Sequence, residues 1–197
     1  MTEQTGAVAA AEDQARVLDV LGLAFAADPV MRWFWPEPGV FRTSFPRFAL
    51  AVGGRAFAHG SAHVLGGRAA ALWLPPRITS DDEAITDVMV ESVAQRLLAD
   101  LVAFGDMIHD CHPTFDHWYL PFMGVDPISQ GQGLGSRLLR HTLASCDRDG
   151  TPAYLEASTA RSRMLYQRHG FEVIGEIQVG SSPCVWAMLR HPAPPAT

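Results

Sequence analysis

The residues whose types and spacing could most clearly support chemistry form a glycine-rich segment, Gln130–Ser136. It reads Gln-Gly-Gln-Gly-Leu-Gly-Ser, so glycine stands at every second position, 131, 133 and 135. Glycine tolerates positive φ angles and leaves the backbone open to a ligand, because it has no Cβ. The segment joins a predicted strand, His117–Val125, to a predicted helix, Gly135–Arg148. Backbone amides at such a junction, beside the partial positive charge of a helix N-terminus, indicate a phosphate or pyrophosphate site.

Two common phosphate-binding loops can be compared with this segment. A Walker loop needs Lys and then Ser or Thr after its last glycine, and this segment has no Lys. A dinucleotide-binding turn is closer, because Gly131-x-Gly133-x-x-Ser136 is followed about 20 residues later by Glu156. Against it, a Pro-containing spacer precedes the glycines, and only about 40 residues follow Glu156, too few for the remaining strands. A dinucleotide-binding oxidoreductase therefore stays an alternative at this point.

Two residues outside the glycine-rich segment have types that suit proton transfer. Glu156 lies near the carboxyl end of a predicted strand, Ala153–Ala157, where α/β proteins tend to bind ligands. Burial there would raise the pKa of its carboxyl group toward a useful value. His117 opens the strand that leads to the glycines and has a near-neutral reference pKa. Each is a candidate general base, and a chain of water molecules is a third candidate.

Histidine and cysteine gather in the segment that precedes this strand. His109, Cys111 and His112, with Asp110 and His117, invite comparison with metal sites. Their spacing matches no zinc pattern, since paired Cys-x-x-Cys is absent. We therefore expect no metal and interpret 109–117 as a loop that lines the acceptor site.

An aromatic cluster near the N-terminus is a second candidate for the acceptor pocket. It consists of Trp33, Phe34 and Trp35, with Asp28 and Arg32 close by in sequence. Such clusters usually belong to a hydrophobic core, but charges beside aromatic rings are also typical of a pocket for an organic amine.

The elements that must position these groups follow from hydrophobic spacing and from glycine and proline positions. Helices are predicted over Ala7–Ala27, Phe41–His59, Asp81–Phe104, Gly135–Arg148 and Ala160–His169. Strands are predicted over His63–Leu65, Ala70–Leu74, His117–Val125, Ala153–Ala157, Glu172–Gln178 and Cys184–Leu189.

Two motifs at this spacing resemble the GNAT acetyltransferase family. The first is Val125-x-Pro127 followed by Gln130-x-x-Gly133-x-Gly135, which is similar to the family's pyrophosphate-binding motif. The second is Leu165-Tyr166-Gln167-Arg168-His169-Gly170-Phe171, which resembles the signature L-Y-x-x-x-G-F. The resemblance covers His117–Arg190, and Leu155-Glu156-x-Ser158 with Trp186-x-Met188 is similar to puromycin N-acetyltransferase-like members.

The resemblance implies a fold and a set of site residues. The fold would be a mixed, mostly antiparallel sheet with helices on both faces, splayed between its fourth and fifth strands. Tyr166 would be the general acid, with Glu156 or His117 as base. Thr159 stands where the family often has Asn, and Gln132 where many members have a basic residue. The residues implied to hold acetyl-CoA are Met123, Gly124, Val125, Gln130, Gly131, Gln132, Gly133, Leu134, Gly135, Ser136 and Thr159.

Composition limits the partners and the domain organisation. A chain of 197 residues with 48% hydrophobic and 18% charged residues predicts one globular domain. Within it, 1–116 would form mainly the acceptor side, 117–190 the acetyl-CoA-binding core and 191–197 a tail. The net charge of −6, without a basic stripe, argues against nucleic acid. No apolar run has the length of a membrane helix, and three widely spaced cysteines suggest reduced thiols in a cytoplasm.

These observations predict an N-acetyltransferase that moves an acetyl group from acetyl-CoA directly to a primary amine of a small molecule. None of Cys111, Cys146 and Cys184 is placed to carry the acetyl group, which favours direct transfer. Dimers are common in the family, so a homodimer is a further expectation. A CoA-binding sensor that has lost turnover is the main alternative from another class of protein.

Overall fold

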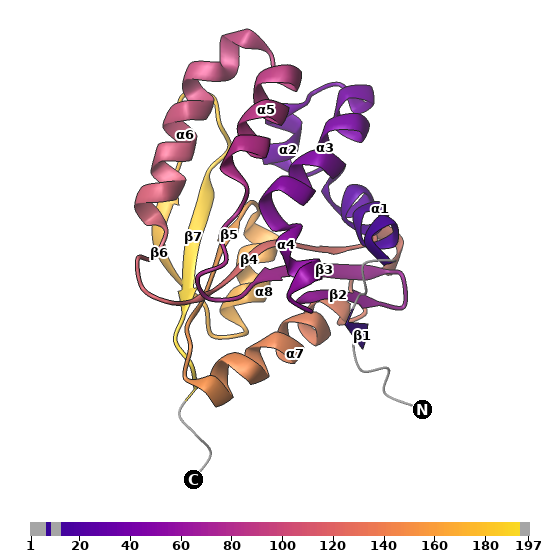
Figure 1. The fold of residues 1–197 in the computed structure, drawn as a ribbon, viewed down its shortest axis with the longest axis vertical. Helices are drawn as coiled ribbons and strands as arrows, with labels where there is room; N and C mark the ends of the chain where they lie inside the picture. The colour runs from indigo at the N-terminus through magenta and orange to yellow at the C-terminus, as the bar shows by residue number, and fades with distance from the viewer. Residues whose placement is uncertain (1–6, 9–12, 194–197) are drawn as a thin grey trace.

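A seven-stranded sheet runs through the middle of the protein (Figure 1). The computed structural model describes residues 7–8 and 13–193. The strand order is β1-β2-β3-β4-β5-β7-β6, and every neighbouring pair is antiparallel except β4 and β5. The predicted mostly antiparallel sheet is confirmed. The strands are β1 (Ala7–Val8), β2 (Ala62–Leu65), β3 (Ala69–Leu74), β4 (Trp118–Val125), β5 (Ala153–Ala157), β6 (Glu172–Ile177) and β7 (Val185–Arg190).

Helices cover both faces of this sheet, as predicted (Figure 1). On β3, Ala70 and Leu72 point into one hydrophobic core, whereas Ala71 and Trp73 point into the other. The first core is formed with α1–α3 and α5–α6, and the second with α7 and α8. The helices are α1 (Gln14–Phe25), α2 (Pro29–Phe34), α3 (Pro38–Gly53), α4 (Arg55–Ala58), α5 (Asp82–Ser92), α6 (Leu98–Cys111), α7 (Leu134–Asp149) and α8 (Ala160–Gln167), with short 3₁₀ turns η2 (Gln95–Leu97) and η3 (Pro127–Ser129).

The parallel pair β4 and β5 separates soon after it begins. Its register contains two pairs, Trp118 with Ala153 and Tyr119 with Tyr154. Beyond Tyr119, β4 stays paired with β3 as far as Val125, while β5 stays paired with β7. The predicted splay between the fourth and fifth strands is therefore confirmed. It opens the centre of the sheet and leaves one backbone edge of β4 unpaired with β5.

The same topology excludes the dinucleotide-binding alternative. That fold needs an open, mostly parallel sheet, and its glycine turn connects neighbouring parallel strands of that sheet. Here one strand pair is parallel and the remaining pairs are antiparallel.

The helix predicted over Asp81–Phe104 is wrong as a single element. Val93 and Ala94 have non-helical backbone, with ψ angles of 144° and 129°, so the predicted helix is interrupted between α5 and α6. The break places Val93 in the core, where its side chain is 7% exposed. Helix α6 then continues to Cys111, so the predicted loop 109–117 is helical at its start.

Smaller corrections concern the N-terminal third. Ala7 and Val8 pair with β2 and are not helical, and residues 9–12 of the predicted helix lie outside the described residues. The helix predicted over Phe41–His59 begins earlier, at Pro38, and is divided near Gly54. Every predicted strand is present to within two residues at each end.

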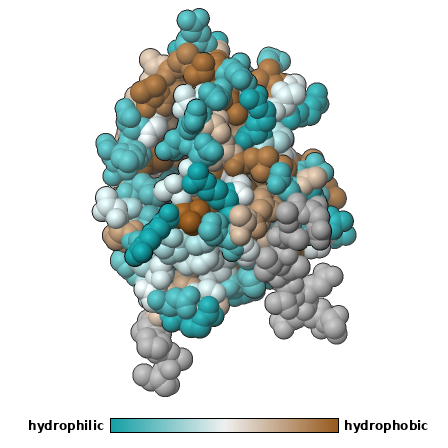
Figure 2. Space-filling model, in the orientation of Figure 1, coloured by the Kyte–Doolittle hydropathy of each residue, from teal (hydrophilic) through white to brown (hydrophobic). Residues whose placement is uncertain are grey.

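The surface carries few large apolar side chains. Figure 2 shows hydrophilic residues over much of one face, with brown patches toward the end where α5 and α6 lie. Val90 on α5 and Val102 on α6 are 62% and 65% exposed. Among the described residues, no helix combines the length and the apolar character that crossing a membrane requires.

Candidate functional site

A cavity of about 700 Å³ occupies the opening between β4 and β5. One side is lined by the end of β4, the glycine-rich segment and the start of α8. The other side is lined by residues of α1, α2, α3 and α6. Both halves of the chain thus contribute to one cavity, and no described residue that lines it is a cysteine.

Two of the three glycines adopt backbone angles that favour glycine. Gly131 has a φ of 79° and Gly133 a φ of 77°. At each of them no atom lies within 4 Å of where a Cβ would stand, so the backbone faces open space. Gly135 is different, because it is helical and a Cβ there would lie 3.2 Å from Leu165 Cδ2. Gly131 and Gly133 therefore shape the loop, whereas Gly135 permits close packing of α7 against α8.

The N-terminus of α7 lies at this loop and is free of side-chain caps. Gly133 is its N-cap, and the first turn contains no acidic residue. The first amides of α7 thus have neither a capping oxygen nor a carboxylate beside them. Arg161 and Arg168 line the same cavity and add positive charge. This donor set fits a pyrophosphate.

Gln130 fixes the beginning of the loop through both ends of its amide. Its Nε2 donates to the carbonyl oxygen of Val125 at 3.3 Å. Its Oε1 accepts from Arg161 Nη1 at 2.7 Å, which ties the loop to α8. Thr159 caps α8 by accepting from Ser162 N at 3.1 Å, so this position has a structural role besides lining the cavity.

The sequence-predicted cofactor residues fall into two groups. Gln132 lines a second, smaller cavity of about 400 Å³ with Arg68 and Arg137. The others line the central cavity: Met123, Gly124, Val125, Gln130, Gly131, Gly133, Leu134, Gly135, Ser136 and Thr159. Gly124 on β4 lies where another element approaches the backbone closely. It pairs regularly with Ala70, and a Cβ there would lie 2.5 Å from Ala24 Cβ on α1.

Tyr166 lines the cavity from α8 and is 7% exposed. Its ring packs edge-on against Phe171, with centroids 5.9 Å apart. Burial, together with the nearby Asp28 carboxylate, raises the pKa of the phenol well above its usual value. The phenol is therefore protonated at neutral pH and is able to donate.

Asp28 also lines the cavity, but its oxygens already have partners. Its Oδ1 accepts from Val30 N at 2.9 Å and Met31 N at 3.2 Å, which caps α2. Its Oδ2 accepts from the Ser158 hydroxyl, just after β5. Burial raises the pKa of this carboxyl group, and the three hydrogen bonds oppose the rise. Asp28 thus joins α2 to the end of β5.

Glu156 presents a buried carboxylate oxygen without a hydrogen-bond partner among the described residues. Its side chain is 11% exposed and lines the cavity from β5. Tyr119 and Tyr154 flank it, and after burial its charge is the next cause that raises the pKa of each phenol. Hydrogen bonding to Glu156 also raises the pKa of both phenols, so the two tyrosine hydroxyls are partners for this carboxylate besides a cation bound in the cavity.

His112 and His117 form a chain that leads from Glu156 toward the surface. His112 Nδ1 lies 3.9 Å from Glu156 Oε1, and His112 Nε2 lies 3.0 Å from His117 Nε2. His117 Nδ1 lies 2.7 Å from the carbonyl oxygen of Phe115 and must donate to it, which leaves its Nε2 as an acceptor. Burial lowers the pKa of His117, and the neighbouring His112 lowers it further.

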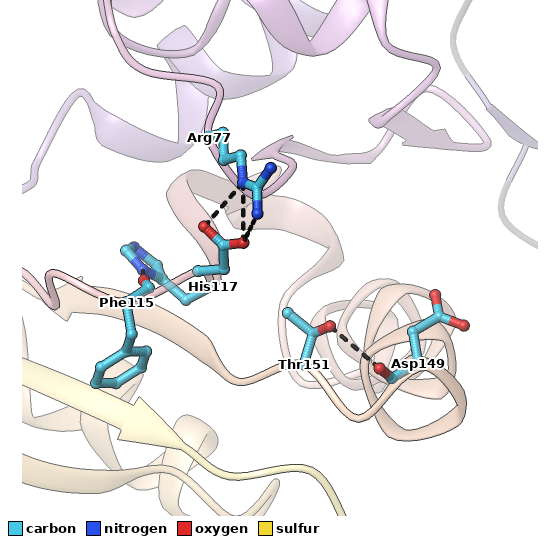
Figure 3. Close-up of polar contacts among 6 residues, drawn as sticks. Arg77, Phe115, His117, Asp149 and Thr151 are labelled. Atoms are coloured by element: carbon cyan, nitrogen blue, oxygen red, sulfur yellow. Dashed lines mark hydrogen bonds and ion pairs between the residues drawn. The ribbon is translucent and has the colours of Figure 1, made fainter.

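Figure 3 shows how the segment that carries His117 is held. The ring lies close to Phe115, and the neighbouring Asp116 forms an ion pair with Arg77. Arg77 Nη2 and Asp116 Oδ2 are 2.7 Å apart, and Arg77 lies shortly after the end of β3 at Leu74. The segment is thereby attached to the chain that follows β3, the strand beside β4. His117 itself does not line the central cavity.

Sequence reasoning missed two parts of this site. His112 was considered only as a metal ligand or loop residue, although it stands between Glu156 and His117. Most of the aromatic wall was missed too, since of the predicted cluster only Phe34 lines the cavity. Within the described part of the chain, no three His, Cys, Asp or Glu side chains are arranged to hold a metal ion.

Comparison with known proteins shows which family part of this chain resembles. Residues 91–173 match the family model described as the acetyltransferase (GNAT) domain. The match covers less than half of the chain, and over these residues the chain is similar to a GNAT acetyltransferase domain. This match includes β4, the glycine-rich segment, α7, β5 and α8. The matched residues therefore include Tyr166, Glu156 and the glycine-rich segment, while α1, α2 and α3 complete the cavity.

Individual relatives agree with the GNAT assignment. An uncharacterised N-acetyltransferase from Schizosaccharomyces pombe is 40% identical over 57 residues, which cover 28% of this chain and 23% of that protein. A Corynebacterium glutamicum structure described as a histone acetyltransferase HPA2 and related acetyltransferase has a TM-score of 0.67, 27% identity and 98% coverage of both chains. Drosophila melanogaster polyamine N-acetyltransferase shares the fold, with a TM-score of 0.63, 17% identity and coverage of 94% and 98%.

Proposed function

We propose that this chain transfers the acetyl group of acetyl-CoA directly to a primary amine of a small molecule. The observation that carries the proposal is that one cavity joins a pyrophosphate-type loop to an acid and a base. Gly131 and Gly133 line it on one side, and Tyr166 and Glu156 line it as well. The GNAT domain and its N-acetyltransferase relatives support the same class of reaction.

Acetyl-CoA would lie along the splayed edge of β4, with its pyrophosphate at the N-terminus of α7. Met123–Val125 have no partner strand on the edge that faces β5, so backbone groups there are available to the pantetheine chain, although the Val125 carbonyl oxygen already accepts from Gln130 Nε2. When bound, acetyl-CoA supplies the thioester carbonyl. An amide at or beside Val125 would stabilise the charge that develops on the carbonyl oxygen.

Glu156 is the residue that we assign to accept the proton of the incoming ammonium. Its side chain lines the cavity and is 11% exposed, and its buried Oε1 has no hydrogen bond to a described residue. His112 Nδ1 lies 3.9 Å from Glu156 Oε1 and would have to move closer to take this proton; it would then pass its Nε2 proton to His117, whose Nδ1 proton would leave Phe115 O for solvent. His117, the other base candidate from the sequence, would thus act at the outer end of a relay.

Tyr166 is the residue that we assign to protonate the leaving thiolate. In the reaction the amine nitrogen forms a bond to the carbonyl carbon and the carbon–sulfur bond breaks. The phenolic proton of Tyr166 goes to the sulfur, and the second proton lost by the amine restores the phenol. The raised pKa of Tyr166 keeps the phenol protonated between turnovers.

Replacement of Tyr166 by Phe tests the proposal, because it removes only the hydroxyl. We expect the rate of thiol release with acetyl-CoA and a primary amine to fall by about 10²–10⁴-fold. Binding of CoA, measured by calorimetry, should stay within twofold of the wild type, because the pyrophosphate contacts are backbone amides. Wild-type protein that binds CoA but releases no thiol with any primary amine would instead identify a CoA-binding sensor.

A further inference from the structure

The part of the cavity away from the glycines has a wall of phenylalanine rings. Phe25, Phe34, Phe48, Phe104 and Phe122 all line it, and they come from five different elements. Their rings form a continuous series, with Phe25 on Phe122, Phe122 on Phe48, Phe48 on Phe34 and Phe34 on Phe104. Successive centroids lie 5.4, 6.0, 5.9 and 6.3 Å apart, all near-perpendicular. Edge-to-face packing of this kind makes a firm apolar surface.

Negative charge is scarce along this wall. Among the described residues that line the cavity, the carboxylates are Asp28 and Glu156. Both oxygens of Asp28 already accept hydrogen bonds, from Val30 N, Met31 N and the Ser158 hydroxyl. Glu156 lines the cavity with a side chain that is 11% exposed, and its Oε1 has no hydrogen bond to a described residue. Of the two carboxylates, Glu156 is thus the less engaged one and the place that we assign to the reacting amine.

We infer that the acceptor is an apolar monoamine, that is, an alkylamine or arylalkylamine with a single cationic group. This inference rests on the proposed function, since it takes Glu156 as the site of the reacting amine. A diamine or polyamine would carry its second ammonium into the phenylalanine wall, where the remaining lining carboxylate, Asp28, already accepts three hydrogen bonds. Burial of an unpaired charge against apolar rings is strongly unfavourable.

The experiment compares hexylamine with 1,6-diaminohexane, two acceptors of equal chain length that differ in the distal group. Thiol release from acetyl-CoA is measured at matched pH, with 2-phenylethylamine as an aromatic monoamine. We expect kcat/KM to be at least about tenfold higher for hexylamine than for the diamine, and 2-phenylethylamine to be accepted. Equal values, or a preference for the diamine, would overturn the inference.

A variant with a second carboxylate in the wall gives an independent test. Val52 on α3 lines the cavity and is half-buried, so Val52→Glu should improve the diamine relative to hexylamine by about tenfold. Val52→Gln is the uncharged control of similar shape. Val40→Glu places the same charge on an exposed site of α3 and should leave the ratio unchanged. A ratio that Val52→Glu does not change, in protein with a normal melting temperature, contradicts the inference.

Equilibrium binding separates this inference from the proposed function. Calorimetry measures the affinity of each amine for the wild-type protein loaded with CoA, and it needs no turnover. Tighter binding of hexylamine than of the diamine without thiol release would retain the monoamine pocket and refute the transferase. Thiol release with a preference for the diamine would retain the transferase and refute the pocket. Binding of neither amine would refute the monoamine pocket, and thiol release with other primary amines would then decide the transferase.

Discussion

Glu156 occupies an unusual position for a carboxylate. It is nearly buried between two tyrosines, it lines the central cavity, and one of its oxygens lacks a hydrogen bond. A carboxylate with a purely structural role would normally satisfy both oxygens, as Asp28 does in the same cavity. This contrast supports proton transfer by Glu156 and helix positioning by Asp28.

Replacement of Glu156 by Gln should therefore change the pH dependence as well as the rate. At pH 7 we expect kcat/KM for amine acetylation to fall by about 10²–10³-fold, because the ammonium loses its proton acceptor. The deficit should shrink as the pH is raised, since more of the amine is then neutral in solution. A pH–rate series measures this directly.

The matched control is Glu176→Gln on β6. Glu176 is exposed, and its Oε1 accepts from Trp186 Nε1 at 3.1 Å. Its replacement should leave the pH–rate profile as it is. A Glu156→Gln profile parallel to the wild type at every pH would show that Glu156 is not the base.

At the scale of single elements, helix α7 offers a comparison of its two ends. Gly133 and Gly150 both have left-handed backbone, with φ angles of 77° and 65°, and neither has an atom near its Cβ position. Gly133→Ala and Gly150→Ala should each destabilise the protein by roughly 1–2 kcal/mol, because alanine is strained there. Chemical denaturation measures this loss.

Only Gly133 borders the cavity, so the two variants should differ in ligand binding. Gly133→Ala is expected to weaken CoA binding by about tenfold or more, since it alters the loop that aims the amides of α7. Gly150→Ala should bind CoA like the wild type. Equal affinity in both variants would contradict a pyrophosphate site at this helix N-terminus.

The elements also show what the sequence could and could not predict. Ala153–Ala157 was predicted to the residue, because a short run of small and apolar residues lies between clear turn signals. The break at Val93 could not be read from local pattern, since it depends on the burial of Val93 in the core. Local periodicity predicts an element, whereas tertiary burial decides where it is interrupted.

The same distinction applies to the site. The glycine loop and Tyr166 lie in contiguous motifs, so both could be proposed from the sequence. The phenylalanine wall is assembled from five elements between α1 and β4, and no spacing along the chain brings those rings together. The position of His112 could not be predicted for a similar reason. It lies between Glu156 and His117 because α6, β4 and β5 pack together in the folded chain.

For the whole molecule, the buried histidine His63 connects stability with pH. It lies in β2 against α7, and its Nε2 is hydrogen-bonded to Thr142 Oγ1 at 3.2 Å. Its ring packs edge-on against the ring of His141, with centroids 4.7 Å apart. Burial and, to a lesser extent, His141 lower the pKa of His63 from 6.5 to about 4. Between these values the unfolded chain binds a proton that the folded chain does not.

The contribution of His63 to the free energy of unfolding should therefore be fully present above pH 6.5 and be lost as the pH decreases toward 4. The loss from this one group is on the order of 3 kcal/mol at most. Urea midpoints measured between pH 7.5 and pH 4.5 test this, with His63→Gln as the comparison. The variant should lose less stability over that range than the wild type, and an equal loss would assign the effect to other groups.

The arrangement of the whole molecule makes the central claim testable, because loop, acid, base and acceptor wall share one cavity. The most direct measurement incubates the wild-type protein with acetyl-CoA and hexylamine and quantifies both products, the free thiol and N-acetylhexylamine, by mass spectrometry. We expect the wild type to form the two products in equal amounts. We expect Tyr166→Phe to form both of them much more slowly than the wild type. Protein that binds acetyl-CoA but yields no N-acetylated amine would contradict it.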